Sequence, residues 1–254
     1  MKQYTNYIFD FYGTLVDIET DEDKPSFWKK MAELYSVYGA DYSWKELKNT
    51  YRALVVEEER LLRERIGCKE PEILLEKVFL RLYKEAKNRH ECDFVPENEE
   101  EFLYHIANTF RVLSRKRLKA YKNTISTLKE LKKNGCNTYL LSNAQGIFTR
   151  PEIEICGVAP YLDDIFISSD HERKKPDKAF LEELIQKYHL NRKETVMIGN
   201  DFISDMGIAH ACNVDGIFLN SFLYDENELK KRNRYHHPVI DDISEILQPD
   251  TSEV

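Results

Sequence analysis

Short apolar runs alternate with helix-like segments from residue 123 onward, and this alternation limits the possible folds more than any other feature. "TISTLKELKKNG" (124–135) has apolar residues at helical spacing and ends at a glycine, whereas "CNTYLLSN" (136–143) is typical of a buried strand. A helix is expected near 149–156. The pattern continues through "DIFISSD" (164–170), "PDKAFLEELIQKYHL" (176–190), "TVMIGND" (195–201), "ISDMGIAHACN" (203–213) and "GIFLN" (216–220). This order predicts a parallel sheet with helices on both faces.

The chain opens with one more apolar run, "YIFD" (7–10), which needs the same sheet because a single strand is not stable alone. Residues 20–118 read as helical, without a convincing strand. The expected helices lie in "KPSFWKKMAELYSVYG" (24–39), "WKELKNTYRALVVEEERLLRERIG" (44–67), "PEILLEKVFLRLYKEAKN" (71–88) and "NEEEFLYHIANTFRVLSRKRL" (98–118). We therefore predict an α/β fold: a Rossmann-like parallel-sheet core, residues 1–18 and 119–254, with an all-helical cap, residues 19–118, inserted after the first strand.

The charge balance bears on the partners of the chain. With 37 basic against 45 acidic residues the net charge is -8, which disfavours binding to nucleic-acid phosphates. The densest basic stretch, "SRKRLKAYK" (114–122), is too short to change this expectation and is either a solvated helix face or a domain junction. No run approaches the roughly 20 apolar residues of a membrane span, and the N-terminus lacks a signal-peptide core. We expect a cytoplasmic protein that binds neither nucleic acid nor membranes.

The cysteines are odd in number and scattered, without a C-x-x-C pair. Reduced, buried thiols are therefore expected rather than disulfides or a zinc site. They are Cys68, Cys92, Cys136, Cys156 and Cys212.

Polar residues follow three of the expected strands. Asp10 ends "YIFD", Ser142 and Asn143 end "YLLSN", and Asn200 and Asp201 end "VMIGND". The carboxyl ends of parallel strands meet at one edge, where ligands bind in open α/β sheets. Folding alone does not require such a cluster, so its convergence favours a functional site.

These residue types suit nucleophilic substitution by a carboxylate. Asp10 would attack an electrophilic centre and form a covalent aspartyl intermediate that water hydrolyses. Ser142 and Asn143 would hold oxygens of the attacked group, with the Thr14 hydroxyl in reach of the same anion. Lys175, in the loop before the helix that follows, would offset the negative charge.

Two further acids, Asp201 and Asp205, would attract a divalent cation or hold the lysine. Because the hydroxyls, the amide and Lys175 suit an anion, the predicted substrate is a small anionic molecule.

Four motifs resemble those of the haloacid dehalogenase superfamily of hydrolases, in the branch with a helical cap after the first strand. They are "DFYGTL" (10–15), Ser142 in "LLSN", Lys175 in "KKPD" and "GNDFISD" (199–205), in the family's order. The resemblance covers essentially the whole chain. It implies that Asp10 is the nucleophile, that Thr14 and Ser142 bind the transferred group, and that Lys175 steadies the charge.

The resemblance also implies Mg²⁺ as a cofactor. The candidate ligands are Asp10, the backbone carbonyl of Tyr12, Asn200, Asp201 and Asp205. Asn200 replaces the usual first acid of the fourth motif, and Asp201 beside it is an alternative ligand, so the choice between these two stays open.

Tyr12 departs from the family's phosphatases, which carry at this position a second aspartate that protonates the leaving group. A phenol with an ordinary pKa of about 10 is poorly matched to that role. The residue is a candidate catalytic residue that has lost proton transfer, or an aromatic residue packed beneath the cap. A tyrosine here resembles the 2-haloacid dehalogenases, which work without metal because halide needs no protonation.

The later motifs disagree with that subgroup. Its enzymes carry a serine and then an asparagine where this chain has Asn200 and Phe202, and a tyrosine where it has Leu181. We therefore expect a magnesium-dependent phosphatase of a small phosphorylated metabolite. The alternatives are a metal-independent hydrolase of the 2-haloacid dehalogenase type, acting on a small carboxylic acid, and a non-catalytic binding protein. The substrate and the oligomeric state stay open.

Overall fold

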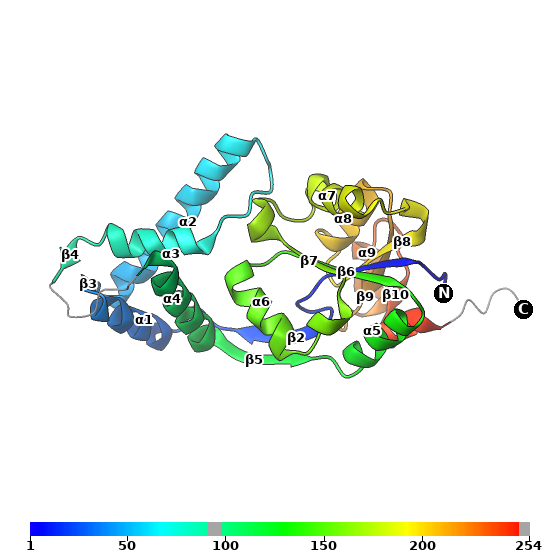
Figure 1. Cartoon of the computed structure of the whole chain (residues 1–254), viewed down its shortest axis with the longest axis horizontal. Coiled ribbons are helices and arrows are strands. Elements are labelled where there is room, and N and C mark those ends of the chain that lie inside the picture. Colours follow the sequence, from blue (N-terminus) through cyan, green and yellow to red (C-terminus); the bar gives the residue numbers. More distant parts are fainter. Residues whose placement is uncertain (91–97, 249–254) are drawn as a thin grey trace, which may run out of the picture.

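The structure is a computed structural model that describes residues 1–90 and 98–248. Within these ranges, six parallel strands form a central sheet in the order β10-β9-β8-β1-β6-β7 (Figure 1). The strands are β1 (Asn6–Phe9), β6 (Asn137–Ser142), β7 (Asp164–Ile167), β8 (Thr195–Gly199), β9 (Asp215–Leu219) and β10 (Val239–Ile240). The predicted α/β class with a parallel sheet is confirmed.

Strand β1 lies in the middle of the sheet although it comes first in the chain. Phe9 is in register with Leu140 of β6 on one side and with Ile198 of β8 on the other. Parallel sheets covered on both faces are built from continuous apolar runs, and these strand residues are fully buried. The residue after Phe9 therefore emerges between the ends of two other strands.

Helices cover both faces of this sheet. Phe9 packs in one apolar cluster with residues of α5 (Thr124–Lys133) and α6 (Gly146–Ile155). Ile8 points the other way, into a cluster with α7 (Lys178–Tyr188) and α8 (Asp205–Ala211). Helix α6 begins three residues before its predicted position. The remaining short elements of this part are α9 (Glu226–Arg232), η1 (Ala159–Tyr161), η2 (Ser168–His171), η3 (Arg192–Glu194) and η4 (Ile243–Leu247).

The inserted part, which we call the cap, contains the four predicted helices. They are α1 (Pro25–Val37), α2 (Trp44–Ile66), α3 (Leu75–Lys84) and α4 (Glu99–Ser114). We predicted an all-helical cap, and this is wrong in one detail: β3 (Ala40–Asp41) pairs with β4 (Asn88–Arg89). Two-residue strands are too short to show a period of two, so the sequence pattern did not reveal them.

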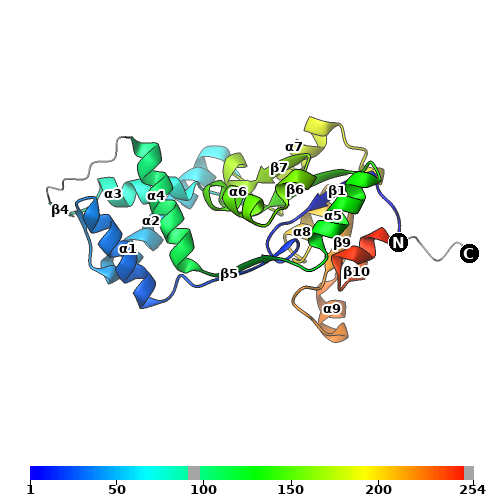
Figure 2. The ribbon, with the colours of Figure 1, turned by 60° about the horizontal axis from the view of Figure 1, so that its bottom comes forward.

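An antiparallel ribbon joins the cap to the core (Figure 2). It consists of β2 (Val16–Thr20) and β5 (Arg115–Ala120). The helix predicted over 98–118 therefore ends at Ser114, and the basic stretch is a domain junction. Arg117 pairs with Asp17 across the ribbon at 2.6 Å. Both predicted domain boundaries fall inside this ribbon, and the division itself stays a prediction.

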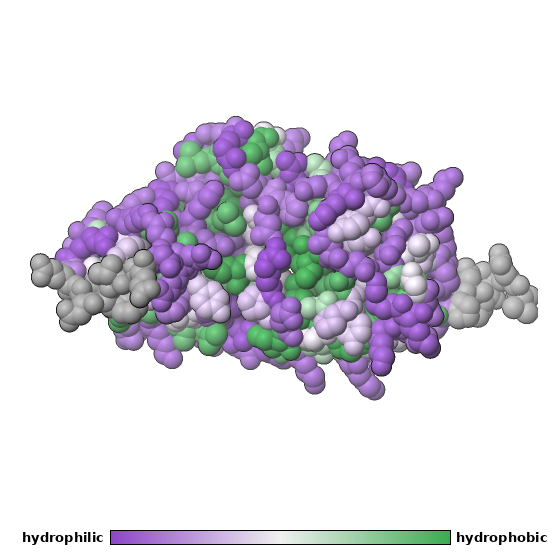
Figure 3. Space-filling model, viewed as in Figure 1, coloured by the Kyte–Doolittle hydropathy of each residue, from purple (hydrophilic) through white to green (hydrophobic). Residues whose placement is uncertain are grey.

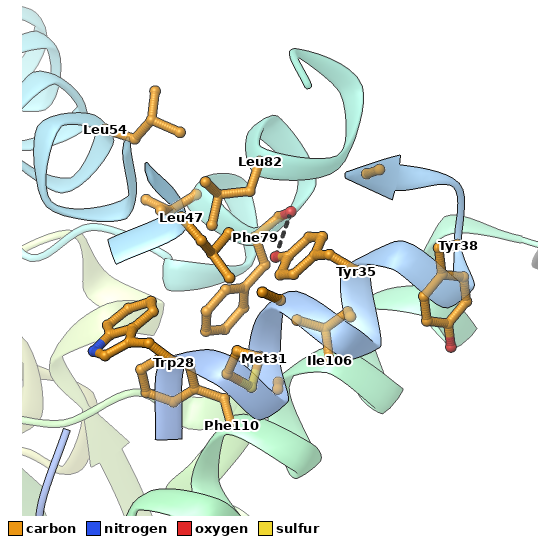
Figure 4. Packing of buried hydrophobic residues seen from close by; sticks show 14 of the residues in the cluster. Trp28, Met31, Tyr35, Tyr38, Leu47, Leu54, Phe79, Leu82, Ile106 and Phe110 are labelled. Atoms are coloured by element: carbon orange, nitrogen blue, oxygen red, sulfur yellow. Dashed lines mark hydrogen bonds between the residues drawn. The ribbon is translucent and has the colours of Figure 1, made fainter. Parts of the chain in front are cut away.

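The cap has its own hydrophobic core, in which aromatic side chains of α1, α3 and α4 interdigitate (Figure 4). Tyr35 is buried there and its hydroxyl donates to the backbone carbonyl of Phe79 at 3.0 Å. Phe148 of α6 belongs to the same cluster and stacks on Phe110 with ring centroids 6.0 Å apart. The hydrophobic core of the cap therefore extends onto a helix of the sheet domain.

Cys68 and Cys212 are buried free thiols, as predicted, whereas the free thiols Cys136 and Cys156 are only half-buried. The expectation for Cys92 lies outside the described residues. Among the helices that the structure describes, none has the length and apolar character needed to cross a membrane.

Candidate active site

Asp10 lies at the carboxyl edge of the sheet, directly after β1. Its backbone N–H donates to the Ile198 carbonyl at 2.9 Å, and its side chain is largely buried. The carboxylate oxygen Oδ1 accepts hydrogen bonds from Ser142 Oγ at 3.0 Å and from Lys175 Nζ at 2.8 Å. The fold thus brings together three of the predicted site residues from distant parts of the chain.

Lys175 is buried between two carboxylates. Its Nζ lies 2.8 Å from Asp10 Oδ1 and 2.7 Å from Asp205 Oδ1, and it donates to the Leu141 carbonyl at 2.6 Å. Burial acts to lower the pKa of the ammonium, but the two carboxylates outweigh this and raise it. The lysine therefore stays charged.

Asp205, the first residue of α8, is fully buried on the far side of this lysine. Its Oδ2 accepts the backbone N–H of Asp201 at 3.0 Å. Burial raises the pKa of the Asp205 carboxyl, Lys175 opposes the rise, and the Asp10 charge adds to it. A Cβ on Gly199 would lie 2.2 Å from Asp205 Oδ2, so only glycine lets this carboxylate approach the end of β8.

Asn143 pairs with the backbone of the lysine loop. Its Nδ2 donates to the Lys175 carbonyl at 2.9 Å, and the Lys175 N–H donates to Asn143 Oδ1 at 2.7 Å. The side chain therefore fixes the position of Lys175 with both of its polar atoms.

Thr14, in the loop that follows Asp10, contacts Asn200. Thr14 is fully buried, and its Oγ1 lies 3.5 Å from Asn200 Oδ1, a long contact. Asn200 Nδ2 donates to Ser221 Oγ at 3.2 Å. Gly13 has a φ of +79°, and a Cβ there would lie 2.1 Å from Asn200 Nδ2. The loop of the nucleophile is therefore packed tightly against Asn200.

Asp201 is exposed and caps the turn before α8. Its Oδ1 accepts the backbone N–H groups of Ile203 at 2.9 Å and Ser204 at 2.6 Å. One of its carboxylate oxygens is therefore committed to local backbone.

The Tyr12 hydroxyl is held by α6 and the cap. It donates to Glu152 Oε2 at 2.5 Å, lies 3.0 Å from Thr149 Oγ1, and accepts from Arg111 Nη2 at 3.1 Å. Burial raises the pKa of the phenol; the charge of Arg111 opposes this and that of Glu152 adds to it. The phenol therefore stays protonated, with its proton directed at Glu152.

Glu152 and Arg111 were not identified from the sequence. The available signal was an acid on an otherwise buried helix face, four residues after Phe148, where an apolar residue is the usual choice.

Two side-chain oxygen atoms at this site, Asp10 Oδ2 and Asn200 Oδ1, are of the type that binds Mg²⁺ and are not fully paired within the described residues. Mg²⁺ takes oxygen ligands, often one or two carboxylates plus substrate phosphate. Asp10 Oδ2 accepts no hydrogen bond from the residues that the structure describes, and Asn200 Oδ1 makes only the long contact with Thr14. Asp205 fits less well, because one of its oxygens contacts Lys175 and the other accepts an N–H. The described residues contain no cluster of three His, Cys, Asp or Glu side chains placed to hold a metal.

Comparisons with known proteins all find hydrolases. A family model described as haloacid dehalogenase-like hydrolase matches residues 4–213. The chain is 29% identical over 132 residues to a glyceraldehyde 3-phosphate phosphatase of Methanothermobacter thermautotrophicus, which is 52% of this chain and 58% of that protein. It is 30% identical over 80 residues to a phosphoglycolate phosphatase of Vibrio cholerae, covering 32% and 35% of the two chains. Each match spans less than two thirds of the relative.

Among solved structures, a 2-haloacid dehalogenase from Pseudomonas syringae pv. Tomato superposes with a TM-score of 0.61 at 17% identity, over 96% of this chain and 98% of the other. At this identity the likeness shows the fold alone.

Proposed function

Because this chain belongs to the haloacid dehalogenase-like hydrolases, we propose that it hydrolyses a small phosphorylated metabolite with Asp10 as the nucleophile and Mg²⁺ as cofactor. The family and the two relatives named as phosphatases support a hydrolase, so we set the binding-protein alternative aside. The observation that carries the proposal is the state of Asp10. One oxygen is fixed by Ser142 and Lys175, while the other is left without a partner in the described residues.

The reaction has two steps. In the first, Asp10 Oδ2 attacks phosphorus, the bond from phosphorus to the leaving oxygen breaks, and an aspartyl phosphate forms. In the second, water attacks phosphorus, the bond to Asp10 breaks, and inorganic phosphate and the free carboxylate are produced. Lys175 holds one oxygen of the carboxylate in place for attack, and its own position is held by Asp205 and Asn143.

The Ser142 hydroxyl contacts the nucleophile, and the Thr14 hydroxyl contacts Asn200. Both hydroxyls would donate to phosphate oxygens. Asp10, Asn200 and the backbone carbonyl of Tyr12 are the residues that would hold Mg²⁺. When bound, the ion would neutralise charge on the phosphate and polarise its oxygens.

Tyr12 is not a proton donor in this proposal, because its hydroxyl proton is directed at Glu152. The leaving oxygen therefore departs with little help from the residue two positions after the nucleophile. We expect fast turnover of phosphates whose leaving groups are weakly basic, such as aryl or acyl phosphates, and slow turnover of simple alkyl phosphates.

The absence of a proton donor at Tyr12 favours a second candidate function. This is metal-independent displacement of halide from a 2-halocarboxylic acid. There Asp10 would attack the carbon that bears the halogen, halide would leave without a proton, and water would hydrolyse the ester. The contacts of Tyr12 suit this reaction, whereas the Asp10 oxygen that has no partner in the described residues suits the phosphatase.

A substrate panel separates the two candidates. Phosphate release from aryl, acyl and alkyl phosphates and halide release from 2-haloacids are measured with Mg²⁺ and with a chelator, using Asp10→Asn as the negative control. Phosphate release that chelation abolishes is the expected result. Halide release that the chelator does not affect would transfer the assignment to the dehalogenase reaction, and full activity of Asp10→Asn would refute both.

A further inference from the structure

A buried carboxylate outside the reaction centre connects the cap to the loop of the nucleophile. Glu152 of α6 is 1% exposed. It accepts hydrogen bonds from Arg111 Nε at 2.8 Å, Arg111 Nη2 at 2.9 Å and Arg115 Nη1 at 2.8 Å. The Tyr12 hydroxyl donates to it at 2.5 Å. These four residues, Tyr12, Arg111, Arg115 and Glu152, are called the junction cluster below.

The members of the junction cluster come from separate parts of the fold. Arg111 lies in the last turn of α4, in the cap, and Arg115 begins the ribbon strand β5. Glu152 lies on α6, which packs on the sheet, and Tyr12 is two residues after Asp10. A single carboxylate thus ties together the cap, its connecting ribbon and the loop that carries the nucleophile.

The charges of the arginine side chains keep Glu152 of the junction cluster ionised. Burial acts to raise the pKa of Glu152, but hydrogen bonds from Arg111 and the charge of its guanidinium more than offset this and lower it. Glu152 is therefore ionised and needs its donors, because an unpaired buried charge is strongly unfavourable. The bidentate contact of Arg111 also fixes the orientation of both partners.

Cation–π contacts also fix the position of Arg111. The guanidinium carbon of Arg111 lies 5.3 Å from the ring centre of Phe148 and 5.5 Å from that of Tyr12. Phe148 is one turn before Glu152 and packs in the hydrophobic core of the cap. In the space-filling view, hydrophobic residues lie in the middle of the molecule, between the purple surfaces of cap and core (Figure 3).

A second contact lies at the loop between α2 and α3. Gln145 Nε2 donates to Glu72 Oε1 at 2.7 Å and to the Ile73 carbonyl at 2.9 Å, and its Oε1 accepts the Leu75 N–H at 2.9 Å. The Lys174 N–H, next to the active-site lysine, donates to the Glu70 carbonyl at 3.0 Å. The cap therefore also contacts the core at the residue before α6 and in the loop that carries Lys175.

We propose that Glu152 is a positioning residue, which holds the cap in one orientation over Asp10 by fixing Arg111 and Tyr12. A buried ion pair adds little stability compared with apolar residues of the same size, so the junction cluster gives the protein orientation rather than stability. This inference rests on the proposed function, because its catalytic readout is turnover. If the cap shifts slightly, the substrate is held in a poorer position relative to Asp10, and this lowers the rate of reaction. We therefore expect kcat to be more sensitive to the junction cluster than KM.

The test compares Glu152→Gln, Arg111→Gln and their double variant with Arg150→Gln. Arg150 lies on the same helix and pairs with Asp170 at the surface at 2.6 Å, so it is a matched control. We expect Glu152→Gln to lower kcat by about tenfold or more with KM little changed, and Arg150→Gln to behave as wild type. Because the two residues act as a unit, the double variant should be no worse than Glu152→Gln alone. Unchanged kcat in Glu152→Gln, or additive losses in the double variant, would overturn the proposal.

Hydrogen exchange provides a readout that does not depend on the substrate. Amides of β2 and β5 should exchange faster in Glu152→Gln than in Arg150→Gln, with the strands of the central sheet unchanged. Uniformly faster exchange over the whole chain would indicate general destabilisation and would contradict the proposal. Should Glu152→Gln fail to fold, Tyr12→Phe removes a single hydroxyl from the cluster and must show the same pattern. If the wild type hydrolyses neither phosphates nor haloacids, the proposed function fails, and the exchange pattern alone decides on the positioning role.

Discussion

Lys175 Nζ lies between Asp10 Oδ1 and Asp205 Oδ1, at 2.8 Å and 2.7 Å, so one ammonium serves two buried carboxylates. Removing the lysine would leave both acids without a counter-charge in a low-dielectric site. The ammonium therefore fixes the position of the candidate nucleophile and contributes to the stability of the core.

Lys175→Met should abolish turnover and destabilise the fold. Breaking a buried pair by removing one partner costs about 3–5 kcal/mol, and the nucleophile loses its fixed orientation. Urea unfolding and single-turnover assays measure the two effects. Lys174→Met, one position earlier in the same loop, is the control and should retain wild-type stability and rate. Retained turnover in Lys175→Met would contradict the role assigned to the lysine.

The Asp205 carboxyl makes stability depend on pH in a defined direction. Its pKa is raised from 3.8 to about 6, chiefly by burial. An acid whose pKa is raised in the folded state penalises folding once it ionises, so this penalty is absent below about pH 4 and complete above about pH 6. Relative to Asp205→Asn, the wild type should therefore lose stability as the pH rises through this window. Denaturant unfolding at several pH values measures this, and parallel stability curves for the two proteins would refute it.

Tyr12→Phe should lower kcat by the same factor at every pH and leave the shape of the pH profile unchanged. The reason is that the phenol stays protonated and its proton is committed to Glu152. Loss of one limb of the pH–rate profile in this variant would show that the phenol does transfer protons.

A series of aryl phosphates tests the same feature through the substrate. Without a proton donor at residue 12, the rate of Asp10 phosphorylation should fall steeply as the leaving phenol becomes more basic. Tyr12→Asp, which restores a carboxyl group at this position, should flatten the dependence. A dependence that is already flat in the wild type would mean that another group protonates the leaving oxygen.

Gly13→Ala should impair the protein more than Gly135→Ala. Both glycines have positive φ, +79° and +76°, so both substitutions carry about 1–3 kcal/mol of backbone strain. At Gly135 nothing lies within 4 Å of the new Cβ, whereas at Gly13 it would lie 2.1 Å from Asn200 Nδ2. Thermal unfolding of the two variants isolates this clash, and equal losses would argue against the close packing of the nucleophile loop on Asn200.

Asn200→Asp should lower the Mg²⁺ concentration needed for half-maximal phosphate release, by about tenfold, because it adds a carboxylate to the proposed ligands. Titration with Mn²⁺, followed by electron paramagnetic resonance, measures the affinity independently of turnover. Ser221→Ala, which removes the hydrogen-bond partner of Asn200 Nδ2, is the matched control. A metal affinity that Asn200→Asp leaves unchanged would exclude residue 200 as a ligand.

The alternation of apolar runs and helices was enough to predict the parallel sheet and the edge at which Asp10 and Ser142 meet. These features follow from local periodicity and from the rule that parallel strands place their carboxyl ends together. Strand ends such as Asp10 and Ser142 need only correct register to become neighbours.

Only the tertiary structure decided what Tyr12, Asn143 and Asp201 contact. Tyr12 meets Glu152, 140 residues further along the chain, and Asn143 pairs with the Lys175 backbone. Sequence periodicity reports which face of an element is buried, because that depends on near neighbours in the chain. The partner of a buried polar group depends on how distant elements pack, because the group must be satisfied by whatever donor or acceptor the fold places beside it.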